Sequence, residues 1–459
     1  MSNYKKLVSN SIIFAIGNLG SKLIIIFLVP FYTYYLTTQE FGIVDLATNT
    51  INMLLPIISL SIFDSVLRFS MDNNEDRREV LTNGVVITTL GAIISIILFL
   101  LFITKNSIFY YMIIILILQS YQSLFSQYIR AIGQVKVFAV NGILTAVALS
   151  LANIIFISFY KLGIDGYLLS MVISTLISCI YLIIRSSLAK DFSLACFNKN
   201  LVKQMILYSL PLIPNSFMWW IINASNRYFI VYFISLEDNG LFSVASKIPS
   251  VLAIFQMIFF QAWQLSAIDE FGSKSQNSFF SKVFEIFSSF MIIITSFIFI
   301  FLNPIVKILL SSSYFDSWKF VPFLLMGTLF SSFSSFFGTN YIAAKKTKGA
   351  LLSSIVGSIT NIFLCLLLIP IIGTNGAGIA TMFSFLFMWL YRVLDTKNMV
   401  EISLNKRKLI LQITLLFAQI LMLYKGFIIL NVIIFLLLLI TNISIVKIII
   451  KKFLNKIKK

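Results

Sequence analysis

Apolar stretches of about twenty residues recur along the chain, separated by short breaks of Gly, Pro, Asn and charged residues. A helix of about 20 apolar residues is long enough to cross the ~30 Å hydrocarbon core of a bilayer. The pattern predicts fourteen transmembrane helices, with the approximate limits 11–36, 42–66, 80–104, 108–129, 137–160, 164–185, 205–234, 240–267, 280–302, 320–344, 349–371, 376–396, 409–424 and 427–449. The segment 303–319 is expected to be a loop or an interfacial stretch.

Composition agrees with this pattern. Hydrophobic residues make up 59% of the 459 positions and charged residues 11%, whereas a soluble globular protein carries roughly a quarter charged residues. The first apolar run is too long for a signal-peptide core and lacks a small-residue cleavage site, so we expect it to be a retained helix. The fold class predicted is an all-α polytopic membrane protein.

The distribution of Lys and Arg tests the number of helices independently. If the N-terminus is cytoplasmic, 27 of the 35 basic residues fall in cytoplasmic segments, 5 fall in outward loops and 3 lie inside spans. Cytoplasmic loops of membrane proteins are enriched in Lys and Arg, and one missed span would invert every later loop. We therefore expect both termini to be cytoplasmic. The net charge of +18 then reflects topology, and no nucleic-acid partner is expected.

Two hairpins six spans apart resemble each other. The stretch "LTTQEFGIVDLA" (36–47) follows the first span, and "SLEDNGLFSVA" (235–245) follows the seventh. Both contain acidic residues and lead into the next helix, with Gly42 and Gly240 in register. We expect these glycines to lie in equivalent outward hairpins.

A second pair of connections repeats with the same offset. "YKLGIDGYLLS" (160–170) joins spans five and six, and "IIGTNGAGIAT" (371–381) joins spans eleven and twelve. Each has a G-x-x-G turn after a span that carries an Asn, which is Asn153 or Asn361. Two matches six spans apart predict parallel six-helix repeats, an arrangement that transporters use. The expected division is 1–190 and 191–400 for two pseudo-symmetric six-helix bundles, and 401–459 for helices 13 and 14 with a basic tail.

Sequence motifs for catalysis or cofactor binding are not found. The chain has no His, no G-x-x-x-x-G-K-[ST] motif and no paired spacing among Cys179, Cys196 and Cys365. Its longest predicted cytoplasmic segment is too short to fold alone. We therefore expect a transporter and not an enzyme, with no cofactor and no metal.

Three basic residues lie inside predicted spans: Lys22, Arg227 and Lys247. Charges in the membrane are costly and usually face a bundle interior or a watery cavity. Together they predict an interior that attracts anions. The alternatives are that each pairs with an acid, Asp45 and Asp64 being the candidates, or that the Lys247 ammonium reaches the outer interface.

Polar and aromatic residues on the same helices are candidates for a supporting role. Four asparagines are placed to bind hydroxyl groups or to join helices by hydrogen bonds, namely Asn18, Asn49, Asn223 and Asn226. Tryptophan side chains suit either stacking on sugars or packing and interfacial anchoring, and the candidates are Trp219, Trp220 and Trp263.

Two stretches carry a resemblance to a known family: "NSIIFAIGNLGSKLIIIFLVPFYTYYLTTQEFGIVDLA" (10–47) and "SLPLIPNSFMWWIINASNRYFIVYF" (209–233). The chain resembles the Wzx-type polysaccharide flippases of the MOP exporter superfamily over roughly residues 5–400. The resemblance implies two bundles around a cationic cavity that opens alternately to either membrane face. It also implies a bacterial cytoplasmic membrane protein whose substrate is an oligosaccharide unit on a polyprenyl diphosphate, moved to the outer leaflet for capsule, O-antigen or exopolysaccharide synthesis.

The resemblance also assigns expected roles to individual residues. Lys22, Arg227 and Lys247 match basic sites of the family. The family often has Asp before the Arg, where this sequence has Asn226, which puts an acid-dependent ion coupling in doubt. The partners implied are membrane lipids, H⁺ or Na⁺ as a coupling ion, and a glycan polymerase of the same pathway.

Two other functions compete with this one. A MATE-type drug or cation antiporter, from another branch of the superfamily, needs carboxylates in its cavity, whereas the predicted interior is cationic; a lipid II-type flippase is a closer relative. A membrane-embedded glycan polymerase or ligase usually carries a large extracytoplasmic loop, and the largest here is 303–319.

Overall fold

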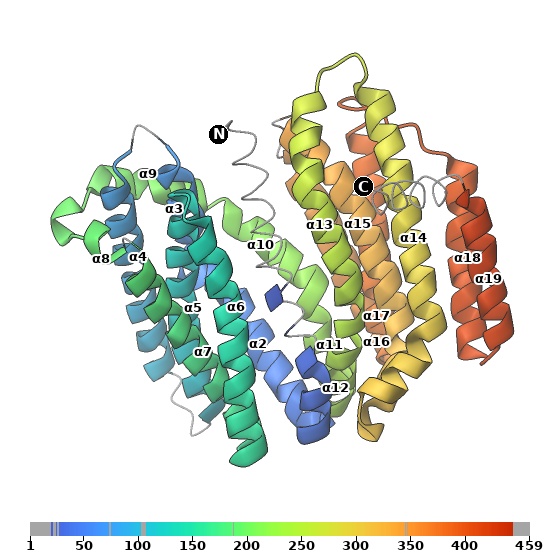
Figure 1. Ribbon diagram of the computed structural model, residues 1–459, viewed down its shortest axis with the longest axis horizontal. Coiled ribbons are helices and arrows are strands. Elements are labelled where there is room, and N and C mark those ends of the chain that lie inside the picture. The colour runs from blue at the N-terminus through green and yellow to red at the C-terminus, as the bar shows by residue number, and fades with distance from the viewer. Residues whose placement is uncertain are drawn as a thin grey trace, which may run out of the picture. The chain divides into compact units, whose positions relative to one another are not determined.

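The computed structural model describes residues 20–21, 24, 27–72, 75–101, 107–186, 188–344, 346 and 348–443. Within these residues every secondary-structure element is a helix (Figure 1). Twelve of the described helical segments, from Thr38–Ile58 to Lys406–Tyr424, are long and apolar enough to cross a membrane, and a shorter apolar helix follows. They correspond to predicted spans two to fourteen, while half of the first predicted span lies outside the described residues. The chain is an all-α multi-pass membrane protein.

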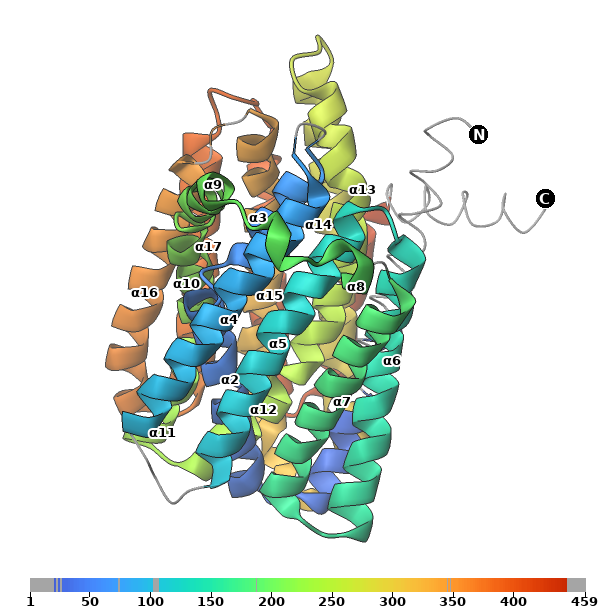
Figure 2. The same ribbon diagram turned by 90° about the vertical axis from the view of Figure 1, so that its left-hand side faces the viewer.

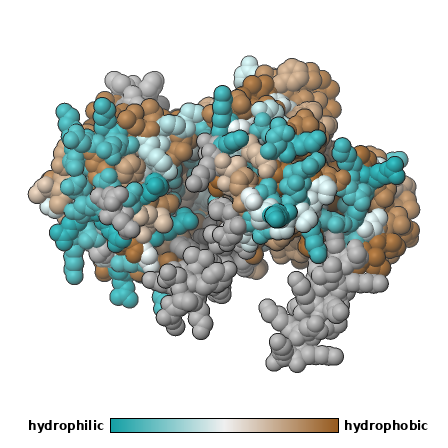
Figure 3. All heavy atoms as spheres, turned by 90° about the horizontal axis from the view of Figure 1, so that it is seen from above, coloured by the Kyte–Doolittle hydropathy of each residue, from teal (hydrophilic) through white to brown (hydrophobic). Residues whose placement is uncertain are grey.

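The chain folds as two compact units, which are Met1–Trp220 and Ile221–Lys459. The change of unit falls inside predicted span seven, so the division expected at residues 190 and 400 stays a prediction. Figure 3, seen from above Figure 1, shows many hydrophilic side chains on that face and hydrophobic ones at its flanks. These flanks suit contact with lipid.

Unit 1 contains predicted spans one to six and the first half of span seven. In chain order its described helices are α2 (Thr38–Ile58), α3 (Ile62–Ser70), α4 (Arg77–Leu101), α5 (Ser107–Ala131), α6 (Val135–Asn153), the π-helix η1 (Ile154–Phe159), α7 (Gly163–Arg185), α8 (Leu188–Asp191), η2 (Leu194–Cys196), α9 (Lys199–Ser209) and α10 (Leu212–Trp220). Helix α7 packs against both α5 and α6 (Figure 2). Residues of α3, α4, α5 and α9 form a buried apolar core that includes Val66, Leu81, Leu124 and Met205.

Unit 2 contains the second half of span seven and all later helices. They are η3 (Ile221–Ser225), α11 (Asn226–Phe233), α12 (Leu236–Ala245), α13 (Lys247–Glu270), α14 (Gln276–Leu309), η4 (Ser312–Phe320), α15 (Val321–Ala343), α16 (Lys348–Ile372), α17 (Asn375–Asp395), α18 (Lys406–Tyr424) and α19 (Ile428–Thr441). Helix α17 packs against α15 and α16, as α7 packs against α5 and α6 in unit 1. The two bundles are therefore pseudo-symmetric, with α18 and α19 added after the second.

In each bundle a buried asparagine forms a hydrogen bond to the first helix, as donor in one bundle and as acceptor in the other. Asn153, at the end of α6, donates from Nδ2 to the hydroxyl of Tyr32 at 2.9 Å, so span five is tied to span one. Asn361, on α16, accepts at Oδ1 from the hydroxyl of Ser225 at 3.1 Å, so span eleven is tied to span seven. The two asparagines that the sequence pattern singled out thus hold the same pair of helices in each unit.

A tyrosine–aspartate pair also recurs in the two units. The hydroxyl of Tyr128 on α5 donates to Asp191 Oδ2 at 2.9 Å, and the hydroxyl of Tyr341 on α15 donates to Asp395 Oδ2 at 2.7 Å. Both tyrosines are fully buried. Each pair joins the fourth helix of its bundle to the sixth helix or the short helix that follows it, which supports the duplication that the hairpins predict.

The two G-x-x-G turns are alike in backbone geometry. The first glycine of each has a positive φ, 53° at Gly163 and 68° at Gly373, a conformation that costs glycine little. The second lies against the backbone of the preceding helix. An added Cβ would be 3.1 Å from Phe156 O at Gly166 and 2.6 Å from Leu368 C at Gly376. Both turns need glycine at both positions.

The other repeated hairpins are tighter than expected. Thr37 caps α2 with a capping box that includes Glu40, and Ser235 caps α12 by accepting from the Asp238 N–H at 3.0 Å. These caps start each helix four residues before its predicted limit. Gly42 and Gly240 therefore lie buried inside the helices, in register with each other but not in the turns. The expectation that they lie in the hairpins is wrong.

Helix α14 is longer than the predicted span 280–302. It continues through Pro304 to Leu309, and the rest of segment 303–319 forms most of the 3₁₀-helix η4. Apolar residues on both sides of the proline keep the helix buried against its neighbours, since Phe299, Leu302 and Val306 are inaccessible to solvent.

Candidate functional site

The predicted span 205–234 is an interrupted helix. Pro211 cannot donate a backbone hydrogen bond, and the chain breaks there between α9 and α10. A second irregularity, the π-helix η3 (Ile221–Ser225), precedes α11 directly. Single π-turns inside helices occur often at functional sites, and Arg227 follows this one by two residues.

Arg227 is buried, with 8% of its surface exposed. Its Nη1 donates to the Asn223 backbone carbonyl at 2.6 Å and to Asn226 Oδ1 at 3.3 Å, and its Nη2 to the Ser246 hydroxyl at 3.4 Å. Its Cζ lies 5.8 Å from the centroid of the Phe242 ring, within the range of a cation–π contact. These contacts, from three helical segments of unit 2, orient the guanidinium plane.

Neighbouring side chains fix the helix that carries Arg227. Asn226 is buried and donates from Nδ2 to the Thr381 hydroxyl on α17 at 3.1 Å. Ser225 donates to Asn361 on α16, as described above. Asn226 occupies the position where the resembling family often has Asp. Its amide is a hydrogen-bond donor to Thr381 and an acceptor from Arg227. A deprotonated aspartate could accept from Arg227 but could not donate to the Thr381 hydroxyl, which itself donates to the Ala377 carbonyl.

Lys247 lies close to this cluster along the chain. It is the first residue of α13, it is half-buried, and it follows Ser246, a partner of Arg227. Its backbone carbonyl accepts a hydrogen bond from the Ser250 hydroxyl. Four of the predicted site residues, Asn223, Asn226, Arg227 and Lys247, therefore lie in one region of unit 2.

The predicted site residues of spans one and two belong to unit 1. Asp45 is buried on α2, and its backbone carbonyl accepts from Asn49 Nδ2 at 2.7 Å. The Asn49 carbonyl in turn accepts from the indole N–H of Trp220 at 2.9 Å. Asp64 is half-buried on α3. The bond to Trp220 uses only the Asn49 backbone, and the Asn49 side chain bonds within its own helix, so its side-chain role stays a prediction.

Two predicted residues, Asn18 and Lys22, lie outside the described residues. The proposed cation of span one therefore stays a prediction. Trp263 is 3% exposed and stacks on Phe336 with ring centroids 4.5 Å apart. It belongs to an aromatic core of unit 2 and is not open to a sugar.

One buried cation was not recognised from the sequence. Arg392, counted with a cytoplasmic loop, lies in the last turn of α17 with 4% of its surface exposed. Its Nε donates to the Ser353 hydroxyl and its Nη1 to the Ser334 carbonyl, both at 2.9 Å. Gly338 leaves space for the guanidinium, because an added Cβ would meet Nη1 at 2.5 Å. Because Arg392 lies at a helix end, the sequence does not distinguish it from the basic residues of the adjacent loop.

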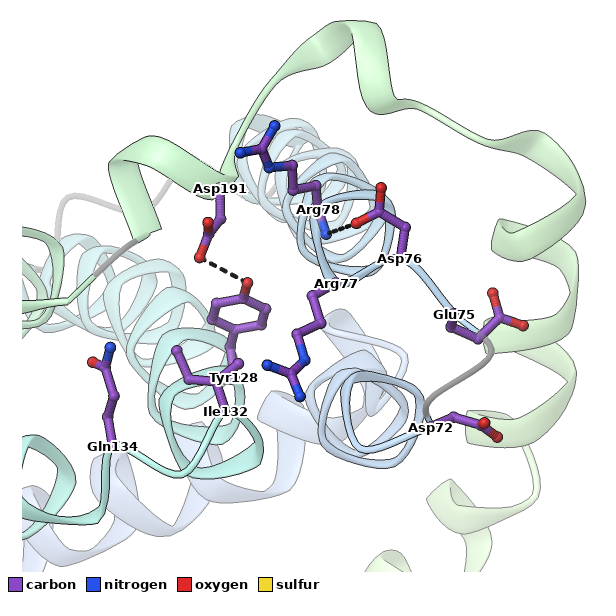
Figure 4. A pocket seen from close by; sticks show the side chains of 9 residues that line it. All are labelled: Asp72, Glu75, Asp76, Arg77, Arg78, Tyr128, Ile132, Gln134 and Asp191. Atoms are coloured by element: carbon purple, nitrogen blue, oxygen red, sulfur yellow. Dashed lines mark hydrogen bonds between the residues drawn. The ribbon is translucent and has the colours of Figure 1, made fainter.

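A polar cavity of about 600 Å³ lies at one end of unit 1 (Figure 4). Its lining combines acids, two arginines and the Tyr128–Asp191 pair: Asp72, Glu75, Asp76, Arg77, Arg78, Tyr128, Ile132, Gln134 and Asp191. The Arg78 backbone N–H donates to Asp76 Oδ1 at 2.9 Å. The mixed charge distinguishes this cavity from the cationic site predicted from the sequence, none of whose residues line it.

Comparison with known proteins decides the family. The family model described as polysaccharide biosynthesis protein matches residues 7–264, which is more than half of the chain and includes Arg227 and Lys247. The chain belongs to the polysaccharide biosynthesis protein family. No curated protein matches this family member in sequence.

Solved structures show the fold of this polysaccharide biosynthesis protein. The lipid II flippase MurJ in an inward closed conformation is 13% identical with a TM-score of 0.69, covering 95% of this chain and 100% of that one. A mutant of the Vibrio cholerae MATE transporter VcmN is 13% identical with a TM-score of 0.61, covering 86% and 97%. An outward-facing multidrug resistance MATE transporter of the MOP superfamily is 13% identical with a TM-score of 0.61, covering 86% of this chain and 96% of that one. The chain shares its fold with these three proteins.

Proposed function

We propose that the chain is a flippase for lipid-linked oligosaccharides. Its substrate is a glycan repeat unit on a polyprenyl diphosphate, moved from the inner to the outer leaflet of the bacterial cytoplasmic membrane for surface polysaccharide synthesis. The observation that carries the proposal is the match to the polysaccharide biosynthesis family over residues 7–264. A fold shared with a lipid II flippase adds support, since that protein moves a substrate named as a lipid.

Arg227 is the residue that we assign to the diphosphate. A guanidinium presents a planar fork of N–H donors that fits phosphate oxygens, and it stays charged at any physiological pH. Arg227 lies inside the matched region, in a membrane-spanning segment, and its plane is already oriented by Asn223, Asn226 and Ser246. Lys247 and Lys22 would add positive charge, with H⁺ or Na⁺ as the coupling ion and a polymerase downstream.

A drug antiporter is the rival function, because MATE transporters share the fold. The residue before Arg227 is an asparagine that is hydrogen-bonded on both sides. A cationic drug would be repelled by Arg227, whereas an anionic diphosphate would be attracted. This electrostatic difference favours the lipid-linked substrate.

Deletion of the gene in its own host tests the proposed function. Lipid-linked repeat units should accumulate on the cytoplasmic side while surface polysaccharide falls, because polymerisation takes place after transfer to the outer leaflet. Mass spectrometry of extracted lipids and staining of the surface glycan measure the two quantities, and expression of the intact chain should restore both. Unchanged surface glycan together with increased sensitivity to ethidium would instead identify a drug exporter.

A further inference from the structure

A smaller cavity in unit 1 has a lining that the proposed function does not yet use. It has a volume of about 230 Å³ and lies between α5 and α6. Gln122 and Ser126 line it from α5, and Asn141 and Thr145 from α6. Phe138 provides an apolar wall, and an alanine and a glycine complete the described lining. The described lining combines polar groups with a larger share of apolar surface and carries no charged residue.

The hydrogen bonds around the cavity fix which atoms face it. Gln122 donates from Nε2 to the Ser178 hydroxyl at 2.7 Å, and Ser178 donates to Asn141 Oδ1 at 2.8 Å. Since the Ser178 proton is directed to Asn141, the Asn141 atom in contact must be its carbonyl oxygen. The NH₂ group of Asn141 is therefore turned away from Ser178, toward the cavity that Asn141 lines.

Polar groups in this lining lack protein partners. Asn141 is 5% exposed, yet within the described part of the chain its NH₂ group meets no hydrogen-bond acceptor. The hydroxyl of Ser126 likewise forms no hydrogen bond among the described residues. Ser126 is only half-buried, so these groups are open to the cavity, and a polar ligand or water that enters it can pair with them.

The composition of the lining selects the kind of ligand. A phosphate would need a cation and a metal ion would need carboxylates, and neither is present in the described lining. Neutral amides and hydroxyls offer donors and acceptors side by side, which suits sugar hydroxyls, while the apolar part of the lining suits the apolar face of a pyranose. The volume equals that of about eight liquid waters, at ~30 Å³ each, which is room for one sugar ring.

We propose that this cavity binds one neutral sugar of the transported glycan. The proposal rests on the proposed flippase function, and it adds an uncharged site to the diphosphate site at Arg227. Sugar hydroxyls would accept from Asn141 Nδ2, exchange hydrogen bonds with Ser126 and donate to the Gln122 carbonyl oxygen. The pre-formed Gln122–Ser178–Asn141 chain would hold these groups in place before the sugar enters.

Direct sugar binding to the full chain in lipid nanodiscs tests the site. The probes are free methyl glycosides of glucose, galactose and N-acetylglucosamine, observed by saturation-transfer NMR. Ser126→Leu fills the cavity without breaking a described hydrogen bond, and Ser126→Ala removes only the hydroxyl. Ser123→Leu makes the same chemical change one turn earlier on α5, outside the described lining.

At least one glycoside should bind to the wild type and to Ser123→Leu. Ser126→Leu should weaken binding by about tenfold or more, and Ser126→Ala by several-fold, the range expected for one lost hydrogen bond. Equal binding by wild type and both Ser126 variants, or no binding of any glycoside to the wild type, overturns the site. If the wild type nevertheless restores surface glycan in the deleted host, the flippase function stands and only the sugar site fails. If a glycoside binds but the wild type does not restore surface glycan in the deleted host, the sugar site stands and the flippase function fails.

Discussion

The guanidinium of Arg227 donates a hydrogen bond to the backbone carbonyl of Asn223, four residues earlier on the same helix, at 2.6 Å. Asn223 belongs to the π-helix η3, where the wider turn departs from the regular pattern of backbone hydrogen bonds. The irregular turn and the charged side chain thus stabilise each other. A cation held in one orientation before its ligand arrives loses less entropy when it binds.

Substitution of Arg227 should impair transport much more than it lowers the amount of folded protein in the membrane. A diphosphate that loses its cation in a partly desolvated site loses several kcal/mol of binding, by the usual cost of unpaired charge. Arg227→Ala should therefore abolish restoration of surface glycan, Arg227→Lys should keep part of it, and Arg227→Glu should be worse than Ala. Protein level in the membrane fraction is the control, with Arg130→Ala on the exposed end of α5 as a matched variant. Normal export by a well-expressed Arg227→Ala would show that the residue is structural.

Arg392 should behave in the opposite way. Its guanidinium satisfies the Ser353 hydroxyl and the Ser334 carbonyl in a buried place. Arg392→Ala leaves these groups without their donor at a cost of about 3 kcal/mol, given ~1.5–3 kcal/mol for a charged hydrogen bond. The melting temperature of the purified protein should fall by several degrees, more than for Arg227→Ala. Equal melting temperatures for the two variants would refute this contrast.

The repeated tyrosine–aspartate pairs should contribute similarly to both units. Tyr128→Phe and Tyr341→Phe each remove one hydrogen bond to a carboxylate without changing the buried ring. Each should cost about 1 to 2 kcal/mol, and because the pairs lie in different units the double variant should show the sum. Thermal unfolding of the two single variants and the double variant measures this. A double variant no less stable than either single one would argue against independent pairs.

The second glycines of the G-x-x-G turns should differ in their tolerance of alanine. An added Cβ would lie 2.6 Å from backbone at Gly376 but 3.1 Å at Gly166. Gly376→Ala should therefore reduce protein level and melting temperature more than Gly166→Ala, because backbone can move only with its helix. The reverse order would mean that the α16–α17 turn opens more easily than its close contact implies.

The topology is a further prediction of the account. Reporter fusions at residue 443 and in the loop at residue 271 should report the cytoplasm, and a fusion at residue 426 should report the outside. An external report from residue 271 would invert the second half of the chain and remove the basis for a parallel repeat.

Much of the fold follows from the sequence because apolar length and loop charge are properties of single segments. Asn153 and Asn361 were singled out by position, and the structure gives them equivalent partners. Hydropathy places Gly42 and Gly240 in turns. Capping by Thr37 and Ser235 starts each helix earlier than hydropathy indicates, so both glycines lie inside helices. Helix caps depend on single side chains, whereas hydropathy is averaged over many residues and does not resolve a single capping side chain.

The candidate site is harder to predict from the sequence than the fold, since its contacts join different segments of the chain. Arg227 was found because a charge within an apolar run is conspicuous, but its partner Ser246 comes from the next helical segment. Arg392 was missed because it stands at a helix end next to loop charges. The Asn141 cavity was missed because neutral polar residues at helical spacing resemble ordinary helix contacts.

Translocation by the purified protein tests the central claim most directly. The full chain, reconstituted in vesicles, should move a fluorescent polyprenyl-diphosphate oligosaccharide from one leaflet to the other, measured by the fraction of label accessible to a membrane-impermeant quencher. It should not move a phosphatidylcholine labelled in the same way, and Arg227→Ala should slow the oligosaccharide by at least about tenfold, as loss of a ~1.4 kcal/mol interaction would. No difference from protein-free vesicles, or equal movement of both lipids, would contradict the account.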